Sequence, residues 1–397
     1  MTVLRVAFVM PSASRRGGGM YTSVRRLAQA LMATGDCDVR VVAPQDPDTD
    51  ADLDSWSPVP VEVVTPEPLL GYLHSRHVES FLDRCRPTLC HRHGMWLYPS
   101  AAVHAWCRRT NTPYLVSPRN ALSPLHLQRR RFPKAAIWTG IERAHLAGAA
   151  CIHALTSREC DDIRTAGIRN PACVIPNGID IPRFPADGHS CSLEVAGVDR
   201  GRHRTLVYIG RLHPYKGLET LVTAWSLAAA RLGGFEDRWR LVIAGPSEGG
   251  TKAGLTRLTT RLGVANSVVF LDGVYGSDKW ALLRQAWATI LPSRSEGHPI
   301  AALESFAAGR QALLTPECNL PESFSAQAAV RIERDPEAIF AAIATLDVQD
   351  EATRARLGER ARAFVASHHS WDQIAARMAA VYRWAVGISP SPCGITF

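Results

Sequence analysis

The stretch that decides the fold spans residues 287–322 and reads WATILPSRSEGHPIAALESFAAGRQALLTPECNLPE. Residues 288–291 form a short apolar run, which predicts a buried strand, and Pro292 ends it. The loop at 293–298 is therefore expected at the carboxyl end of that strand. Open α/β sheets bind their ligands at this edge.

A helix is predicted directly after this loop. Pro299 suits the first helical position, residues 300–308 favour a helix, and Gly309 is a typical C-terminal stop. The N-terminus of the helix should point to the ligand-binding edge. Its partial positive charge and free N–H groups suit a phosphate.

Two carboxylates lie on this frame, Glu296 in the loop and Glu304 in the second helical turn. The helix begins between them, so both can project to the same side at different depths. Such a pair suits two polyhydroxylated groups joined by a diphosphate, which is the shape of a nucleotide-sugar. Taken alone, the pair also fits two surface carboxylates without a ligand.

This stretch resembles the E-x7-E element of the retaining GT-B glycosyltransferases of family 4, which include sucrose synthases and bacterial mannosyl- and glucosyltransferases. Residues 295–299, 303–304 and 308–309 match its pattern, and 315–322 resembles the branch that builds exopolysaccharide and capsule repeats. The resemblance implies that Glu304 binds the ribose and that Glu296 contacts the donor sugar as a catalytic residue. The donor-binding residues that it implies around the helix start are Gly297, His298, Pro299 and Ile300.

A second motif follows the strand-like run 205–209. Its loop carries Arg211 and Lys216 before a helix expected at 218–230. Phosphates favour fixed cations, and the chain has only four lysines against forty-one arginines, so a lysine here runs against the composition. The pattern Gly-Arg-Leu-x-x-x-Lys-Gly is specific to the same family, where both side chains bind the donor diphosphate.

A glycine-rich loop separates the first predicted strand, at 4–10, from an amphipathic helix expected at about 21–34. It is neither a GxGxxG dinucleotide motif nor a P-loop, and by itself it fits a flexible turn as well as a phosphate loop. The resemblance implies that Gly18 and Gly19 contact the donor diphosphate.

Two more candidates follow strand-like runs of the N-terminal half. His93 lies in a His-Gly-hydrophobe-Trp run similar to that of family members, although a structural histidine fits as well. Arg119 stands where many relatives have a histidine beside the transferred sugar. Either residue can be the one nearest the reacting centre, but Arg119 is permanently cationic and cannot act as a general base.

A length of 397 residues predicts two or three domains. Pro, Gly, Ser and charged residues dominate from 182 to 203, which indicates a linker. The expected division is an acceptor-binding domain at 1–187, a linker at 188–203, a nucleotide-sugar domain at 204–370 and a helix at 371–387 that crosses back to the first domain.

No metal site is expected. Cys85, Cys90, His91 and His93 lack a second zinc half-motif, and the ten cysteines are scattered. The aspartates between 46 and 54 alternate as in a calcium loop, but Leu53 occupies the glycine position and no glutamate closes the loop. A solvated acidic loop is the favoured interpretation of that segment.

The net charge of +8 is uneven, with a basic segment at Arg129–Trp138 that interleaves arginine and lysine with aromatic residues. The segment fits an anionic membrane surface or a diphosphate-lipid acceptor, and a plain solvated face fits equally well. Nucleic acid is disfavoured because no nucleic-acid motif accompanies the segment. The chain starts without a signal peptide and has no apolar run of ~20 residues, which predicts a cytoplasmic protein, with the inner face of the plasma membrane as a further option.

The sequence thus predicts an α/β protein of the GT-B type, with two Rossmann-like doubly wound domains facing across a cleft. By resemblance it is a retaining hexosyltransferase (EC 2.4) of exopolysaccharide, lipopolysaccharide or capsule synthesis. A UDP- or GDP-linked sugar would be the donor, a saccharide or polyprenyl-diphosphate-linked saccharide the acceptor, and no cofactor or metal is expected. The alternatives are another GT-B enzyme, such as a nucleotide-sugar epimerase, and a non-catalytic sugar-binding protein.

Overall fold

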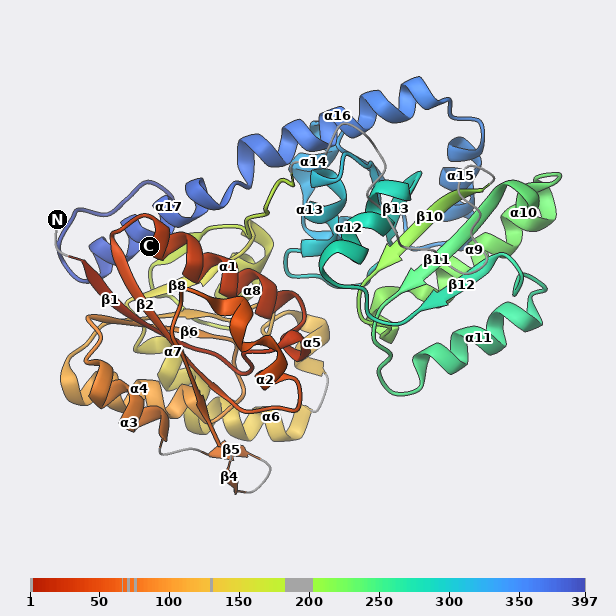
Figure 1. The fold of residues 1–397 in the computed structure, drawn as a ribbon. Coiled ribbons are helices and arrows are strands. Elements are labelled where there is room, and N and C mark those ends of the chain that lie inside the picture. Colours follow the sequence, from red (N-terminus) through yellow and green to blue (C-terminus); the bar gives the residue numbers. More distant parts are fainter. Residues whose placement is uncertain are drawn as a thin grey trace. The chain divides into compact units, whose positions relative to one another are not determined.

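The computed structural model describes residues 3–65, 67–69, 72–74, 77–128, 131–182 and 203–396, with the backbone alone for 67–69, 72–74 and 131–133. The chain folds into two compact units (Figure 1). Unit 1 comprises residues 1–178 and 371–397, and unit 2 comprises 179–370. The predicted linker at 188–203 lies outside the described residues except for His203.

Unit 1 is a doubly wound sheet in the order β16-β9-β8-β7-β6-β1-β2-β3. All neighbours pair in parallel except β16 with β9. The order reverses at β1 and β6, so ligand-binding groups are expected where these two strands end. The strands are β1 Leu4–Val9, β2 Cys37–Pro44, β3 Val61–Val64, β6 Leu89–His93, β7 Tyr114–Ser117, β8 Cys151–Ala154, β9 Ala172–Val174 and β16 Ile395–Thr396; β4 Glu67–Leu69 and β5 Tyr72–His74 form a separate antiparallel pair.

Helices cover both faces of this sheet, and two apolar clusters fill the layers between them. The C-terminal helix α17 (Trp371–Ala385) packs against α1 (Gly19–Ala33) and completes the core of unit 1. Its place in unit 1 follows from the buried stripe Trp371, Ile374, Met378 and Tyr382, which has helical spacing. The other helices are α2 Thr49–Asp52, α3 His77–Cys85, α4 Pro99–Thr110, α5 Pro124–Gln128, α6 Arg131–Ile137, α7 Arg143–Ala147 and α8 Ser157–Thr165, with 3-10 turns at Arg15–Gly17 and Leu53–Trp56 and a π turn at Trp138–Glu142.

Unit 2 is an all-parallel sheet in the order β12-β11-β10-β13-β14-β15. Its inner strands are mostly buried runs of apolar residues, as expected for a sheet covered by helices on both faces. The strands are β10 Arg204–Ile209, β11 Trp239–Ala244, β12 Val268–Leu271, β13 Ala288–Leu291, β14 Ala312–Leu314 and β15 Ala329–Arg331. The helices are α9 Leu218–Arg231, α10 Phe235–Arg238, α11 Thr251–Arg261, α12 Gly276–Gln285, α13 Ile300–Ala307, α14 Pro321–Ser325, α15 Pro336–Asp347 and α16 Glu351–His368, with 3-10 turns at Pro214–Lys216 and Pro316–Cys318.

The two Rossmann-like doubly wound sheets confirm the predicted fold class. The decisive stretch folds as expected, since the strand at 288–291 is β13 and the helix is α13, with Pro299 as its N-cap and Gly309 at φ 70° just after its end. The helices expected at about 21–34 and 218–230 agree with α1 and α9 within two residues at each end.

Candidate functional site

The strand order of unit 2 reverses between β10 and β13, so the loops that follow these strands meet at the carboxyl edge of the sheet. They are residues 210–217 and 292–299. Gly217, at φ 68°, joins them, because a Cβ there would lie 2.1 Å from the carbonyl oxygen of Pro292. Only glycine fits this position, and the contact brings Lys216 to the second loop.

Lys216 and Glu296 form a largely buried ion pair at this junction. The Lys216 Nζ lies 2.6 Å from Glu296 Oε1, and the Ser293 hydroxyl donates to the same oxygen at 2.7 Å. The Asn319 amide donates to the Glu296 carbonyl at 2.6 Å. Glu296 is therefore held by three side chains and is not a solvated loop residue.

Glu304, in the second turn of α13, forms a second ion pair. The Lys279 Nζ on α12 lies 2.5 Å from Glu304 Oε1, and the two side chains are 18% and 6% exposed. Burial raises the pKa of Glu304, and the nearby Lys279 opposes that rise. Lys279 was not predicted, although it is one of only four lysines, which was the signal that singled out Lys216.

The other predicted donor residues lie along the same edge. Arg211 is 55% exposed, and its guanidinium forms an ion pair with Glu248 at 2.7 Å, separate from the Lys216–Glu296 pair. Gly297 and His298 precede Pro299, and the His298 ring lies 5.3 Å from that of His369.

The helix α13 begins at Ile300 after the N-cap Pro299, which makes no side-chain capping bond. Its first turn therefore keeps the anion-binding character that the sequence predicts. Glu296, which pairs with Lys216, lies on the loop before this helix, and Glu304 lies in the second turn of the helix.

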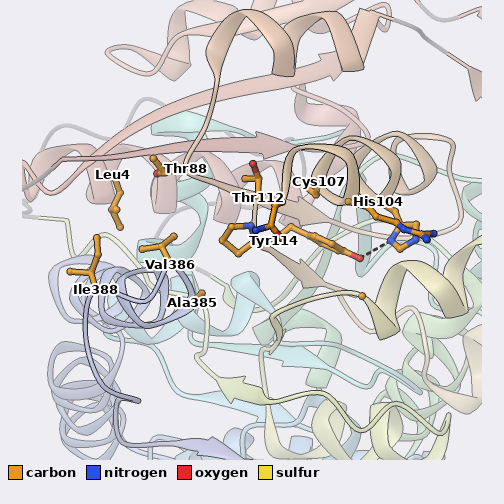
Figure 2. Close-up of a pocket in the computed structure, with 13 residues that line it drawn as sticks. Leu4, Thr88, His104, Cys107, Thr112, Tyr114, Ala385, Val386 and Ile388 are labelled. Atoms are coloured by element: carbon orange, nitrogen blue, oxygen red, sulfur yellow. Dashed lines mark hydrogen bonds between the residues drawn. The ribbon is translucent and has the colours of Figure 1, made fainter.

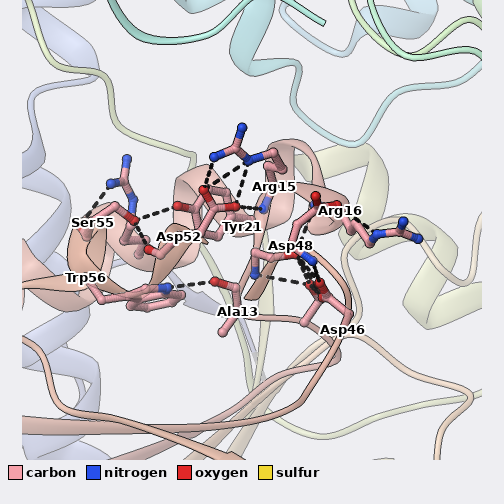
Figure 3. A network of polar contacts seen from close by, with 12 residues as sticks. Ala13, Arg15, Arg16, Tyr21, Asp46, Asp48, Asp52, Ser55 and Trp56 are labelled. Atoms are coloured by element: carbon pink, nitrogen blue, oxygen red, sulfur yellow. Dashed lines mark hydrogen bonds and ion pairs between the residues drawn. The ribbon is translucent and has the colours of Figure 1, made fainter. Parts of the chain in front are cut away.

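In unit 1 the glycine-rich loop is fixed by the acidic segment that follows β2 (Figure 3). Asp46 accepts hydrogen bonds from the hydroxyls of Ser12 and Ser14 at 2.7 Å, and the Trp56 indole donates to the Ala13 carbonyl at 2.8 Å. The prediction of a solvated acidic loop was wrong for Asp46 and Asp52, whose carboxylate oxygens accept hydrogen bonds from this loop, whereas Asp50 and Asp54 are exposed.

The end of the glycine-rich loop reaches the first helix. Asp52 accepts from the backbone N–H of Arg15 at 2.7 Å and from its guanidinium. Gly18 takes the left-handed φ of 56°, and Gly19 is the first residue of α1. The loop therefore leads directly into a helix N-terminus at the carboxyl end of β1, which suits an anion.

We expect Asp52→Asn to lower the unfolding free energy of unit 1 by about 1–3 kcal/mol, because it weakens charged hydrogen bonds to Arg15. Urea unfolding of the full chain measures the change. Asp50→Asn, an exposed carboxylate on the same short helix, is the matched control and should change the value by less than about 0.5 kcal/mol. Equal effects of both variants would show that Asp52 does not hold the loop.

His93 and Arg119 lie together at the carboxyl edge of the unit 1 sheet. The Arg119 Nη2 donates to His93 Nδ1 at 3.2 Å, and its Nη1 donates to Asn177 at 3.0 Å. Burial lowers the pKa of His93 well below its ordinary value, with help from His91 and Arg119. Neutral His93 then carries its proton on Nε2, a buried atom without a hydrogen-bond partner among the described residues.

Burial also lowers the pKa of Arg119 to about 10, so it stays charged at neutral pH. The pair can offer one cation and one N–H donor to a hydroxyl or a phosphate oxygen. Since the two side chains touch, the choice between His93 and Arg119 as the residue nearest the reacting centre stays open.

A buried chain of hydrogen bonds supports this corner of unit 1. The Tyr382 hydroxyl lies 2.6 Å from His91 Nδ1, and His91 Nε2 lies 2.7 Å from the Ser117 hydroxyl. Ser117 lies 2.6 Å from His153 Nδ1, and His153 Nε2 donates to the Ile175 carbonyl at 2.8 Å. Burial lowers the pKa of both histidines, which favours their neutral forms. With both rings neutral, the bond from His153 to Ile175 fixes the direction of every other bond in the chain.

The basic segment Arg129–Trp138 is described only in part. Arg129 and Arg130 lie outside the described residues. Lys134 turns toward its own unit, where its ammonium lies 5.1 Å from the centre of the Trp96 ring and donates to the His126 carbonyl. Among the described residues, no helix combines the length and apolar character needed to span a membrane.

An open cavity of about 700 Å³ lies in unit 1, between Leu4, Tyr114 and Val386 (Figure 2). Leu4 and Tyr114 are the first residues of β1 and β7, so the cavity is at the amino edge of the sheet. The Tyr114 hydroxyl lies 2.9 Å from His104 Nδ1 there. The predicted site residues are all at the carboxyl edges, and the cavity contains none of them.

Family models match both units. Residues 18–178 match the glycosyl transferase 4-like domain, and residues 197–364 match the glycosyl transferases group 1 domain. The first match begins at Gly18 and contains His93 and Arg119, and the second contains both lysine–glutamate pairs.

Two curated relatives have the same name, D-inositol 3-phosphate glycosyltransferase. The D-inositol 3-phosphate glycosyltransferase of Streptomyces avermitilis is 28% identical over 254 residues, which are 61% of this chain and 53% of the relative. That of Pseudarthrobacter chlorophenolicus is 26% identical over 389 residues, 93% of this chain and 91% of the relative. The chain spans about half the length of the first curated relatives it matches.

Solved structures share the fold at low sequence identity. Anabaena HepE in complex with UDP and glucose has a TM-score of 0.77 at 18% identity and covers 95% of this chain and 99% of its own. WaaG, a glycosyltransferase involved in lipopolysaccharide biosynthesis, has a TM-score of 0.68 at 16% identity, with coverages of 95% and 99%. At these identities the likeness concerns the fold alone.

Proposed function

We propose that this chain moves a hexosyl group from a nucleotide-diphosphate sugar to a saccharide or lipid-linked saccharide. The chain belongs to the glycosyltransferases that are built from a glycosyl transferase 4-like domain and a glycosyl transferases group 1 domain. The observation that carries the proposal is the pair of buried lysine–glutamate contacts around the start of α13. Two carboxylates and a helix N-terminus at a switch point match the shape of such a donor.

In this proposal Glu304 accepts hydrogen bonds from the ribose hydroxyls, and Glu296 orients the donor sugar. Lys216, Arg211 and the N–H groups at the start of α13 neutralise the diphosphate as it leaves. Electrostatic stabilisation of a leaving group by fixed charges and dipoles is often the largest part of catalysis. These cations supply the charge that the leaving group needs, so the proposal contains no metal ion.

Lys216 has to exchange partners during this cycle. In the structure its ammonium contacts Glu296 Oε1, and this contact stabilises both charges where little water reaches them. A diphosphate competes for the same ammonium, because its charge exceeds that of one carboxylate. Glu296 is then free to accept from sugar hydroxyls, with Ser293 and Asn319 still holding it.

The acceptor is assigned to unit 1, where His93 and Arg119 offer an N–H donor and a cation. A UDP- or GDP-linked donor, retention at the anomeric carbon, and a role in exopolysaccharide, lipopolysaccharide or capsule synthesis belong to the proposal. It also places the protein in the cytoplasm, at the inner face of the plasma membrane when the acceptor carries a polyprenyl diphosphate.

A calorimetric screen of UDP, GDP, ADP and their glucose and mannose derivatives tests the proposal, with free glucose and mannose as controls. We expect one nucleoside diphosphate and its sugars to bind, free sugars not to bind, and the bound sugar nucleotide to release its diphosphate when an acceptor is supplied. Binding of free sugar alone would indicate a sugar-binding protein. Conversion of the sugar nucleotide to an isomer would indicate an epimerase.

A further inference from the structure

The ion pair between Lys279 and Glu304 connects two helices that lie on either side of β13 in the sequence. Lys279 lies in the first turn of α12, which leads into β13, and Glu304 lies in α13, which leaves that strand. The ammonium contacts Oε1 at 2.5 Å. A carboxylate offers about four lone pairs, so this contact leaves acceptor capacity for a pair of hydroxyls.

Glu304 is buried among apolar residues, so its carboxylate needs a cationic partner such as Lys279. The neighbouring α13 residues Ala302, Leu303 and Phe306 are fully buried, and Glu304 itself is 5% exposed. Burial raises the pKa of Glu304, and within the described residues the opposing influence comes from the charge and the hydrogen bond of Lys279. Without this ammonium the pKa of the carboxyl group would rise further.

The lysine pairs of unit 2 differ in their surroundings. Lys252 also contacts a carboxylate, Asp272, at 2.8 Å, but these side chains are 36% and 92% exposed. Exposed pairs contribute little. The Lys279 pair is largely removed from water, with its side chains 18% and 6% exposed, and in such a setting one charge acts strongly on another.

We propose that Lys279 is a positioning residue, which keeps the Glu304 carboxylate ionised and oriented so that it accepts hydrogen bonds from the two ribose hydroxyls of the donor. The inference rests on the proposed function and adds a residue to it. Lys279 does not touch the reacting atoms. It acts through Glu304, because an ionised acceptor binds hydroxyl groups more strongly than a neutral carboxylic acid.

The test is titration calorimetry of UDP, GDP and ADP between pH 6 and pH 9, with wild type, Lys279→Met and Lys279→Arg, and with Lys252→Met as the matched control. We expect Lys279→Met to bind the preferred nucleotide about tenfold more weakly at pH 7, because hydrogen bonds to a charged group become neutral ones. Its affinity should rise with pH over this range, because a higher pH favours the ionised form of Glu304. Lys279→Arg and Lys252→Met should follow the nearly flat wild-type profile.

The recovery of Lys279→Met with rising pH separates this effect from a loss of folding, and the double variant Lys279→Met with Glu304→Gln tests whether the Glu304 carboxyl group causes that recovery. It has no carboxyl group to titrate, so it should bind weakly with no rise toward pH 9. If Lys279→Met binds with the wild-type affinity and profile, or the double variant keeps the rise, the inference is wrong while the proposed function stands. If the wild type binds none of the three nucleotides, the proposed function fails and the inference falls with it.

Discussion

Replacing Lys216 with methionine should lower turnover about 10²–10³-fold, the usual cost of removing one group aimed at charge that develops in a transition state. Lys216 lies next to Gly217, which packs closely against Pro292 after β13, and its ammonium is 2.6 Å from Glu296. Methionine keeps most of the length of the side chain but cannot stabilise a departing diphosphate. Release of nucleoside diphosphate in the presence of acceptor, followed at saturating donor, measures the change.

Lys252→Met is the control for this variant, because it removes a lysine of the same unit whose partner Asp272 is almost fully exposed. It should keep turnover within about threefold of wild type, as expected for a surface pair. Lys216→Arg should retain part of the activity, since it keeps the charge with another shape. Turnover of Lys216→Met close to that of the control would remove Lys216 from the diphosphate site.

The central stretch could be predicted because its signals are local. A four-residue apolar run, a proline at each end of the loop and a glycine after the helix define β13 and α13 within one residue. Lys216, Glu296 and Glu304 were found for the same reason, since each lies in a short motif. The structure adds that Lys216 pairs with Glu296 and that Glu304 pairs with Lys279.

Pairings between distant elements could not be predicted. Lys279 lies on a different helix from Glu304, and only packing of α12 beside α13 makes them partners. Arg211 is expected at the diphosphate, and its pairing with Glu248 of the neighbouring loop is a contact that its motif does not show. The rarity of lysine pointed to Lys216 and, applied along the whole chain, would have drawn attention to Lys279.

The acidic segment was misread because its pattern is ambiguous. Alternating aspartates resemble a solvated loop or a metal loop, and nothing in the segment shows what it faces. The parallel pairing of β1 with β2 places the loops after both strands side by side, so Asp46 and Asp52 meet Ser14 and Arg15. The partners are 32 and 37 residues apart in the sequence, so no local pattern shows them.

Unit 1 should lose most of its stability between pH 6.5 and pH 5. Four of its histidines are fully buried, and burial is the largest cause of a lowered pKa in each, to about 3 for His153 and well below the ordinary value for His91, His93 and His145. A lowered pKa in the fold means that these side chains take up protons in the unfolded chain first. Stability is therefore present above pH 6.5 and falls as the pH drops below it.

The size of this effect follows from the number of histidines. Each one that stays neutral in the fold contributes a loss of about 1.4 kcal/mol per pH unit below 6.5, so four contribute roughly 8 kcal/mol at pH 5. Burial raises the pKa of Glu142 and Glu159, and their protonation in the fold offsets part of that loss. The remainder is comparable with the whole stability of a typical domain, about 5–15 kcal/mol.

Urea unfolding of the full chain from pH 7.5 to pH 5, with hydrogen exchange of peptides from β6 to β8 to locate the opening, measures this loss. His153→Gln keeps an N–H group for the Ile175 carbonyl and should make the pH dependence shallower by about one proton, because one neutral histidine is gone. His77→Gln removes an exposed histidine of the same unit and should leave the slope unchanged. A flat profile down to pH 5 would mean that the chain from Tyr382 to Ile175 accepts protons without opening, and would contradict the neutral, one-directional hydrogen-bond chain assigned to it.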